Sequence, residues 1–179
     1  YSILIEACGL LRDLGLDFHC EIAGSGPEYG ALKKLTASLN LDKWITITGK
    51  ALNQEEIQEW MKTGDIYAQP CCWSADNDVD GIPRSLMEAM AVGLPSISTT
   101  VAGIPDLIKH KKTGLLIAEQ DAEGLTKAIK LIMDDPSLRQ ELSKGGRQLI
   151  EQRFNLETCL DPLAEIFSHR SNTTIGNGA

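Results

Sequence analysis

The sequence has no long apolar run and no spaced set of metal-ligating side chains. Its longest hydrophobic stretch is far too short to cross a bilayer, and its first residues, YSILIE, lack the basic segment that opens a signal peptide. The five cysteines are odd in number and include no Cys-x-x-Cys pair, which favours buried thiols over a disulfide framework or a zinc site. The histidines His19, His110 and His169 are scattered and share no motif. We expect structural or surface roles for them and a cytoplasmic protein, with peripheral contact to the inner membrane face as an alternative.

Clustered positive charge is also scarce. The chain carries 17 Lys and Arg against 25 Asp and Glu, a formal net charge of -8. A nucleic-acid backbone is bound by clustered basic side chains, so the charge argues against nucleic acid as a partner. The basic run Lys109-His110-Lys111-Lys112 ends after four residues. We interpret it as a solvated loop, and a phosphate or membrane role is the weaker alternative.

What the sequence does contain is an alternation of helical and strand patterns. With 179 residues and 42% hydrophobic side chains it can build one domain with a core. Apolar spacing and turn residues predict helices at 2–15, 27–40, 53–63, 83–92, 121–134, 136–152 and 156–168, and strands at 18–23, 44–48, 66–70, 96–98 and 114–117. We expect one domain over residues 1–170. The polar, glycine-rich tail at 171–179 should be disordered.

Strands joined by helices are mostly parallel, and helices then cover both faces of the sheet. The prediction is therefore an α/β fold with a Rossmann-like parallel sheet. In such sheets ligands bind outside the carboxyl ends of the strands. The segments that follow the predicted strands are the places where a site is expected.

Two of these segments are rich in glycine. Residues 24–27, GSGP, follow the first predicted strand, and residues 49–51, GKA, follow the second. Glycine lets a ligand approach the backbone closely, but a plain strand-to-helix turn explains GSGP equally well. The run is not a dinucleotide fingerprint, because one residue too many precedes the third glycine, Gly30.

The most informative segment is 80–95, DGIPRSLMEAMAVGLP. Pro83 is favoured at the first position of a helix, which would make Ile82 the cap. The backbone N–H groups of Arg84 and Ser85 would then be unpaired within the helix. Such groups form a natural seat for a diphosphate or a sugar hydroxyl.

Glu88 is the sole charge in the apolar stretch 86–92 of this predicted helix. A carboxylate in a largely buried helix needs hydrogen-bond donors. The two adjacent hydroxyls of a ribose would match its two oxygens. An ion pair with Arg84, one helical turn earlier, is the alternative, and the spacing alone leaves both open.

Taken together, these motifs resemble the signature of retaining glycosyltransferases with the GT-B fold, the group 1 or family 4 type. That signature is an acidic residue, seven residues and a glutamate, within a phrase close to EGFPxxxxEAMAxGxP. Here Asp80 and Glu88 have this spacing, and VAGIPDLI at 101–108 and TGLL at 113–116 continue the phrase. GSGP and Gly49 also fall in register, so the similarity covers about residues 2–168.

The resemblance implies that the chain is the donor-binding, C-terminal domain of such an enzyme. Asp80 and Glu88 would be the catalytic residues, with Asp80 near the reacting sugar carbon and Glu88 on the ribose. The implied donor-binding residues are Gly24, Ser25, Gly49, Lys50, Ala51, Gly81, Ile82, Pro83, Arg84, Ser85 and Glu88. No metal or other cofactor is implied. The donor would be a nucleoside-diphosphate sugar, more often a UDP-sugar than a GDP-sugar, with UDP-glucose as our first expectation.

This chain departs from the family pattern in three ways. Asp80 stands where the family usually has glutamate, so its carboxylate is one methylene shorter. The family's diphosphate-binding Arg and Lys, together with the first strand of the sheet, would precede Tyr1. The N-terminal domain that binds a glycan or lipid-linked acceptor is not in the sequence. We therefore expect the isolated polypeptide to bind a donor without turning it over.

Other functions stay open on the sequence. A non-catalytic module that binds a sugar nucleotide is one alternative, and a dinucleotide-binding oxidoreductase is another. The stretch 76–81, DNDVDG, begins like a calcium loop, but Met87 stands where that loop requires glutamate. Asp76 and Asp78 also fit the Asp-x-Asp metal motif of the other transferase fold, although a solvated loop is the simpler interpretation.

Overall fold

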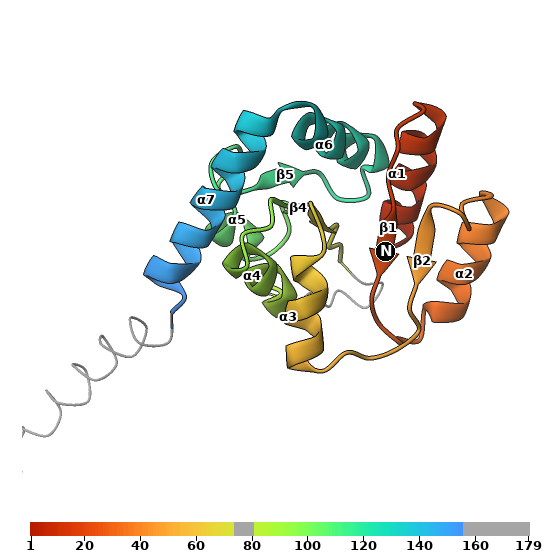
Figure 1. Cartoon of the computed structure of the whole chain (residues 1–179), viewed down its shortest axis with the longest axis horizontal. Coiled ribbons are helices and arrows are strands. Elements are labelled where there is room, and N and C mark those ends of the chain that lie inside the picture. Colours follow the sequence, from red (N-terminus) through yellow and green to blue (C-terminus); the bar gives the residue numbers. More distant parts are fainter. Residues whose placement is uncertain (74–80, 156–179) are drawn as a thin grey trace, which may run out of the picture.

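The computed structural model describes residues 1–73 and 81–155, over which helices and strands alternate as predicted (Figure 1). The elements are α1 (Ser2–Asp13), β1 (Cys20–Ile22), α2 (Tyr29–Ser38), β2 (Ile45–Ile47), α3 (Gln54–Lys62), β3 (Tyr67–Gln69), α4 (Arg84–Ala91), β4 (Ser96–Thr99), α5 (Ile104–Leu107), β5 (Leu115–Ile117), α6 (Ala122–Asp134) and α7 (Pro136–Arg153). The predicted helix at 156–168 and the predicted tail at 171–179 lie outside the described residues.

Two helices differ from the prediction. The four-residue helix α5 was not predicted, because a single turn is too short to show a helical period. In α4 the cap is Pro83 and not Ile82: Pro83 has an extended ψ of 127°, and its carbonyl accepts the N–H of Leu86 at 3.1 Å. The helix therefore begins one residue later, at Arg84. Within the described part of the chain, no helix combines the length and apolarity needed to cross a membrane.

All strand pairs in the described residues are parallel, as predicted, but the strands form two sheets and not one. β1 pairs with β2, and β3, β4 and β5 form a second sheet in that order. The predicted α/β fold of parallel strands and helices is confirmed, while the single sheet of the prediction is divided into two. The division lies between β1 and β3, which are edge strands of different sheets and border the same cavity.

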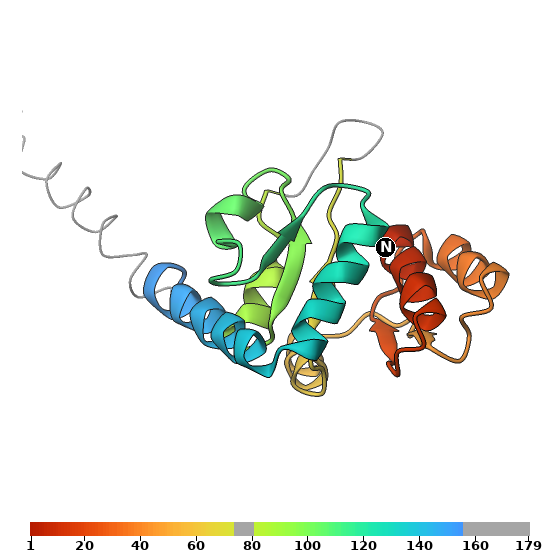
Figure 2. The ribbon, with the colours of Figure 1, turned by 90° about the horizontal axis from the view of Figure 1, so that it is seen from above.

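The two sheets and their helices lie side by side (Figures 1 and 2). α4 and α6 lie on opposite sides of the three-stranded sheet, with α6 also packed against α1. The Thr126 hydroxyl of α6 donates to the carbonyl of Ala7 in α1 at 3.4 Å. One hydrophobic core includes buried side chains from both halves, such as Ile5, Ile45 and Ile97. The shared core and α6 hold the halves in one domain.

A cavity of about 820 Å³ separates β1 from β3. It extends along β1 from Asp17 to Ser25, and residues 63–68 border it on the side of β3. Side chains of α1 and α3, including Leu11 and Trp60, also line it. The cavity therefore has two open strand edges as walls and helices beside them, and it reaches the carboxyl ends of the strands.

Helix α3 begins with a capping box formed by Asn53 and Glu56. Asn53 Oδ1 accepts the backbone N–H of Glu56 at 2.9 Å, and Glu56 Oε2 accepts the backbone N–H of Asn53 at 2.9 Å. The hydrogen bond from the Asn53 backbone, followed by the bond from Lys50, lowers the pKa of the Glu56 carboxyl.

A lowered pKa in the folded state makes this cap depend on pH. The charged carboxylate stabilises the fold above its unfolded pKa of about 4.3, and this contribution is lost as pH falls through the folded pKa. We expect Glu56→Gln to lower the thermal midpoint at pH 7 and the difference from wild type to narrow toward pH 3. Thermal unfolding at several pH values measures it, with Glu59→Gln on the same helix as control. A difference independent of pH would contradict this assignment.

Candidate donor site

The glycine segments after β1 and β2 are joined by one hydroxyl, that of Thr48. Its Oγ1 accepts the backbone N–H of Gly24 at 3.2 Å and the backbone N–H of Lys50 at 3.4 Å. Parallel pairing of β1 and β2 places both segments at the same sheet edge. Thr48 was not predicted as a site residue, although a hydroxyl at the end of a predicted strand is the signal that could have found it.

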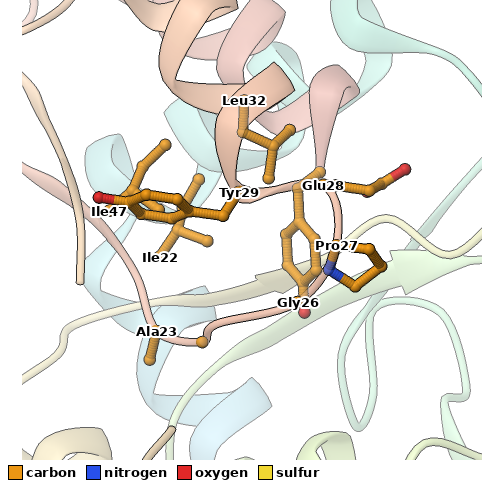
Figure 3. Close-up of a pocket in the computed structure, with 10 residues that line it drawn as sticks. Ile22, Ala23, Gly26, Pro27, Glu28, Tyr29, Leu32 and Ile47 are labelled. Atoms are coloured by element: carbon orange, nitrogen blue, oxygen red, sulfur yellow. The ribbon is translucent and has the colours of Figure 1, made fainter. Parts of the chain in front are cut away.

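Gly49 is required by its backbone and by a neighbouring ring. Its φ of 62° lies in the left-handed region, and a Cβ there would be 2.7 Å from Tyr29 Cε2. Figure 3 shows Tyr29 with Ile22, Leu32 and Ile47 around a second cavity of about 320 Å³. This cavity lies at the carboxyl ends of β1 and β2 and is walled mainly by carbon atoms. An apolar wall suits the flat face of a base or sugar better than a phosphate.

The charge of Lys50 is held beside these glycines. Its Nζ lies 2.9 Å from Glu56 Oε1, the carboxylate of the capping box. Both side chains are more than a third exposed, so the pair contributes little to stability. Lys50 is therefore an exposed positive group beside the glycine segment, paired with Glu56.

Glu88 is partly buried and carries the ion pair that its spacing allows. Its Oε1 accepts from Arg84 Nε at 3.0 Å, with side-chain exposures of 20% for Glu88 and 70% for Arg84. The structure thus contains the alternative in which Arg84 is the partner. The bond engages one of the two carboxylate oxygens, and an exposed pair at this spacing stabilises by only about 0.3–0.5 kcal/mol. Such a pair does not prevent Glu88 from binding a ligand.

The residues just before α4 are fixed by a third glycine. The N–H of Gly103 donates to the carbonyl of Gly81 at 3.1 Å. A Cβ at Gly103 would lie 2.9 Å from Ile82 Cγ1, so only glycine fits without a shift of Ile82. This packing sets the path along which the backbone at 81–82 enters α4. The N–H groups of Arg84 and Ser85 then have no acceptor inside the helix.

Gln69, at the carboxyl end of β3, holds the first turn of α4. Its Oε1 accepts from Ser85 Oγ at 2.9 Å and from the Tyr67 hydroxyl at 3.0 Å. Burial raises the pKa of the Tyr67 phenol well above its usual value, which keeps the hydroxyl protonated as a donor. Gln69 was not predicted as a site residue. A polar residue at the end of an otherwise apolar strand was the available signal.

The large cavity brings several predicted site residues together. Gly24, Ser25, Ala51 and Ser85, which lie on three different segments, all line it. The other predicted donor-binding residues do not line it: Gly49, Lys50, Gly81, Ile82, Pro83, Arg84 and Glu88. The arrangement offers glycine backbone, a helix N-terminus and a serine hydroxyl around one hollow at the strand ends.

The family model for glycosyl transferases group 1 matches residues 1–149. The chain belongs to this family. The amylovoran biosynthesis glycosyltransferase AmsK of Erwinia amylovora is 36% identical over 165 residues, which cover 92% of this chain and 40% of AmsK. The chain therefore spans less than half the length of this relative.

Solved glycosyltransferase structures have the same fold. A glycosyltransferase from Rickettsia africae superposes with a TM-score of 0.80 at 22% identity, covering 96% of this chain and 44% of that one. The Anabaena protein HepE, solved in complex with UDP and glucose, superposes with a TM-score of 0.77 at 20% identity, covering 93% and 44%. The likeness shows a GT-B fold for this group 1 glycosyltransferase chain. Membership of the glycosyl transferases group 1 family argues against the dinucleotide-binding oxidoreductase considered above.

Several predictions for this glycosyltransferase chain fall on residues without a described position. Asp80, the predicted catalytic acid, lies outside the described residues, as do Asp76 and Asp78 of the possible metal loops. Within 1–73 and 81–155, no group of three His, Cys, Asp or Glu side chains is placed to hold a metal ion. The expectation of buried thiols is correct for Cys8 and wrong for Cys72, which is exposed.

Proposed function

We propose that this chain is the donor-binding domain of a retaining, family 4 type glycosyltransferase. The observation that carries the proposal is the convergence of Gly24, Ser25, Ala51 and Ser85 on one cavity at the carboxyl ends of the strands. Family membership supports it, as does the likeness to HepE, whose solved complex contains UDP and glucose. The full enzyme would transfer a hexose from a nucleoside-diphosphate sugar to a glycan or lipid-linked acceptor.

The proposed chemistry is mainly electrostatic. The N–H groups of Arg84 and Ser85 at the start of α4 would bind the diphosphate, since helix N-termini favour anions. Glu88 would accept hydrogen bonds from the ribose hydroxyls. Asp80 would face the donor sugar near the carbon that becomes positively charged. We propose that no metal ion takes part and that the anomeric configuration is retained.

The rest of the enzyme would complete this site. The chain spans 40% of AmsK, so an acceptor-binding domain in the same protein is a proposal that the lengths support. The part of this cavity between the open edges of β1 and β3 has room for a further strand, and the donor would take the part lined by Gly24, Ser25, Ala51 and Ser85. We propose that such a strand carries the Arg and Lys of the family's diphosphate site. Turnover would then require residues beyond 1–179.

Glu88→Ala tests the proposed donor site. Loss of a charged contact to ribose should weaken nucleotide binding by about 1.5–3 kcal/mol, tenfold or more in affinity. The measurement is calorimetric titration with UDP, GDP and NADH, on the chain as it stands and on a longer chain that includes the upstream strand. Circular dichroism checks that the variant is folded.

A matched control exists on α7. Arg147 and Glu151 form the same i,i+4 pair at 2.9 Å, so Glu151→Ala removes an equivalent helical ion pair far from the cavity. It should leave nucleotide affinity unchanged. Equal losses for Glu88→Ala and Glu151→Ala, or binding of NADH in preference to UDP and GDP by both chain lengths, would reject the proposal.

A further inference from the structure

The direction of the hydrogen bond between Ser85 and Gln69 determines what Ser85 can bind. A serine hydroxyl has one proton and two acceptor sites. Ser85 Oγ donates that proton to Gln69 Oε1 at 2.9 Å. The Tyr67 side chain is a second hydrogen-bond partner of Ser85. While its proton is directed to Gln69, Ser85 Oγ has acceptor capacity alone toward the cavity that it lines.

The backbone of Gln69 is anchored to β4 by buried hydroxyl groups. Its backbone carbonyl accepts from Ser98 Oγ of β4 at 2.7 Å, and two residues on, the carbonyl of Cys71 accepts from Thr99 Oγ1 at 2.7 Å. Ser98 and Thr99 are fully buried. The Tyr67 hydroxyl occupies the second acceptor site of Gln69 Oε1, so the carbonyl oxygen has its two donors.

The two kinds of polar group at the start of α4 therefore differ in whether they donate or accept a hydrogen bond. The backbone N–H groups of Arg84 and Ser85 can only donate, which suits phosphate oxygens. While the Ser85 hydroxyl donates to Gln69 Oε1, it can only accept from a ligand, and two acceptors facing each other without a proton repel. An ionised diphosphate is thus disfavoured at Ser85 Oγ, whereas a sugar hydroxyl can donate to it.

We propose that Gln69 is a positioning residue that fixes the Ser85 side chain as an acceptor for a hydroxyl of the donor sugar. This inference rests on the proposed donor site and adds to it a residue of β3 and a preference for the sugar over the diphosphate. Gln69 acts through Ser85 and does not contact the donor.

Paired titrations test the preference. UDP is compared with UDP-glucose, and GDP with GDP-mannose, on the chain extended by the upstream strand. Ser85→Ala should weaken binding of the nucleotide sugar about three- to tenfold and leave binding of the free diphosphate unchanged. Gln69→Met should do the same, and Gln69→Glu, which keeps an acceptor at this position, should bind within about twofold of wild type.

The control is Ser143→Ala on α7. This change removes a hydroxyl that donates to the Gly93 carbonyl at 2.6 Å. It should change neither affinity. If Ser85→Ala weakens the diphosphate and the nucleotide sugar equally, the sugar preference is wrong. If Gln69→Glu weakens binding of the nucleotide sugar as much as Gln69→Met, the Gln69 amide donates to the two hydroxyls and the inference is overturned.

A measurement without ligand separates this inference from the proposed function. Thermal midpoints are compared for Ser85→Ala, Gln69→Met and the double variant. A shared hydrogen bond predicts that the double variant loses less than the sum of the single losses, and additive losses would refute the bond. Failure of the wild-type chain to bind either nucleotide pair would instead reject the proposed donor site, whatever the thermal result.

Discussion

Leu86→Ala should lower the free energy of unfolding by about 2–5 kcal/mol. Leu86 is fully buried on α4 and packs in a cluster with Met90, Val101 and Ile104. Truncation removes apolar contacts and leaves a cavity that the surrounding helices fill only in part. Denaturant unfolding followed by circular dichroism measures the loss, and the slope with denaturant checks that both states keep their compactness.

The same substitution should also affect the site, because Leu86 directly follows Ser85. Loosening the first turn of α4 should weaken nucleotide binding in conditions where the protein is still folded. Leu131→Ala on α6 is the matched control, since this leucine is 38% exposed and should cost less than about 1 kcal/mol. Similar losses of unfolding free energy for Leu86→Ala and Leu131→Ala would show that α4 is not anchored by Leu86 as described.

Gly145→Ala should destabilise the fold by about 3 kcal/mol. A Cβ on Gly145 of α7 would lie 2.1 Å from the backbone carbonyl oxygen of Lys112. A backbone oxygen cannot rotate aside, so α7 would have to move away from the turn that precedes β5. In a helix interior without such a contact, the same change stabilises by about 0.5–1 kcal/mol, so the sign of the effect identifies the contact.

Gly30→Ala provides the control for that sign. Gly30 lies in α2, and a Cβ there would meet no atom within 4 Å. We expect Gly30→Ala to raise the free energy of unfolding by up to about 1 kcal/mol, whereas Gly145→Ala lowers it. Thermal and denaturant unfolding of both variants decide it. Stabilisation by both would mean that α7 does not contact the turn at 112–113.

The order of helices and strands was predictable because it depends on local patterns. The capping box of Asn53 and Glu56 begins α3 where the sequence places it, and apolar periodicity marks the core face of α1. Parallel pairing followed from the helices between the strands. α5 was missed because one helical turn has no period, and the cap of α4 was misplaced by one residue because proline is compatible with both positions.

The candidate site was predictable only in outline. Gly24, Ser25, Ala51 and Ser85 could be assigned to strand ends from the sequence, and they line one cavity. Their contact with a nucleotide sugar stays a prediction, as does the role of Asp80. Thr48, Tyr29 and Gln69 were missed because a side chain's partner in another element depends on how the elements pack, which a local pattern does not specify.

The sequence by itself determined the alternation of helices and strands, the parallel sense of the sheet and the segments at its carboxyl ends, because these depend on local periodicity, turn residues and connection length. Only the tertiary structure decided that the strands form two sheets around a cavity, that Gln69 meets Ser85 across 16 residues, and that Gly145 touches the carbonyl of Lys112. Such contacts arise from close packing between elements, where distances of a few tenths of an ångström decide which atoms meet.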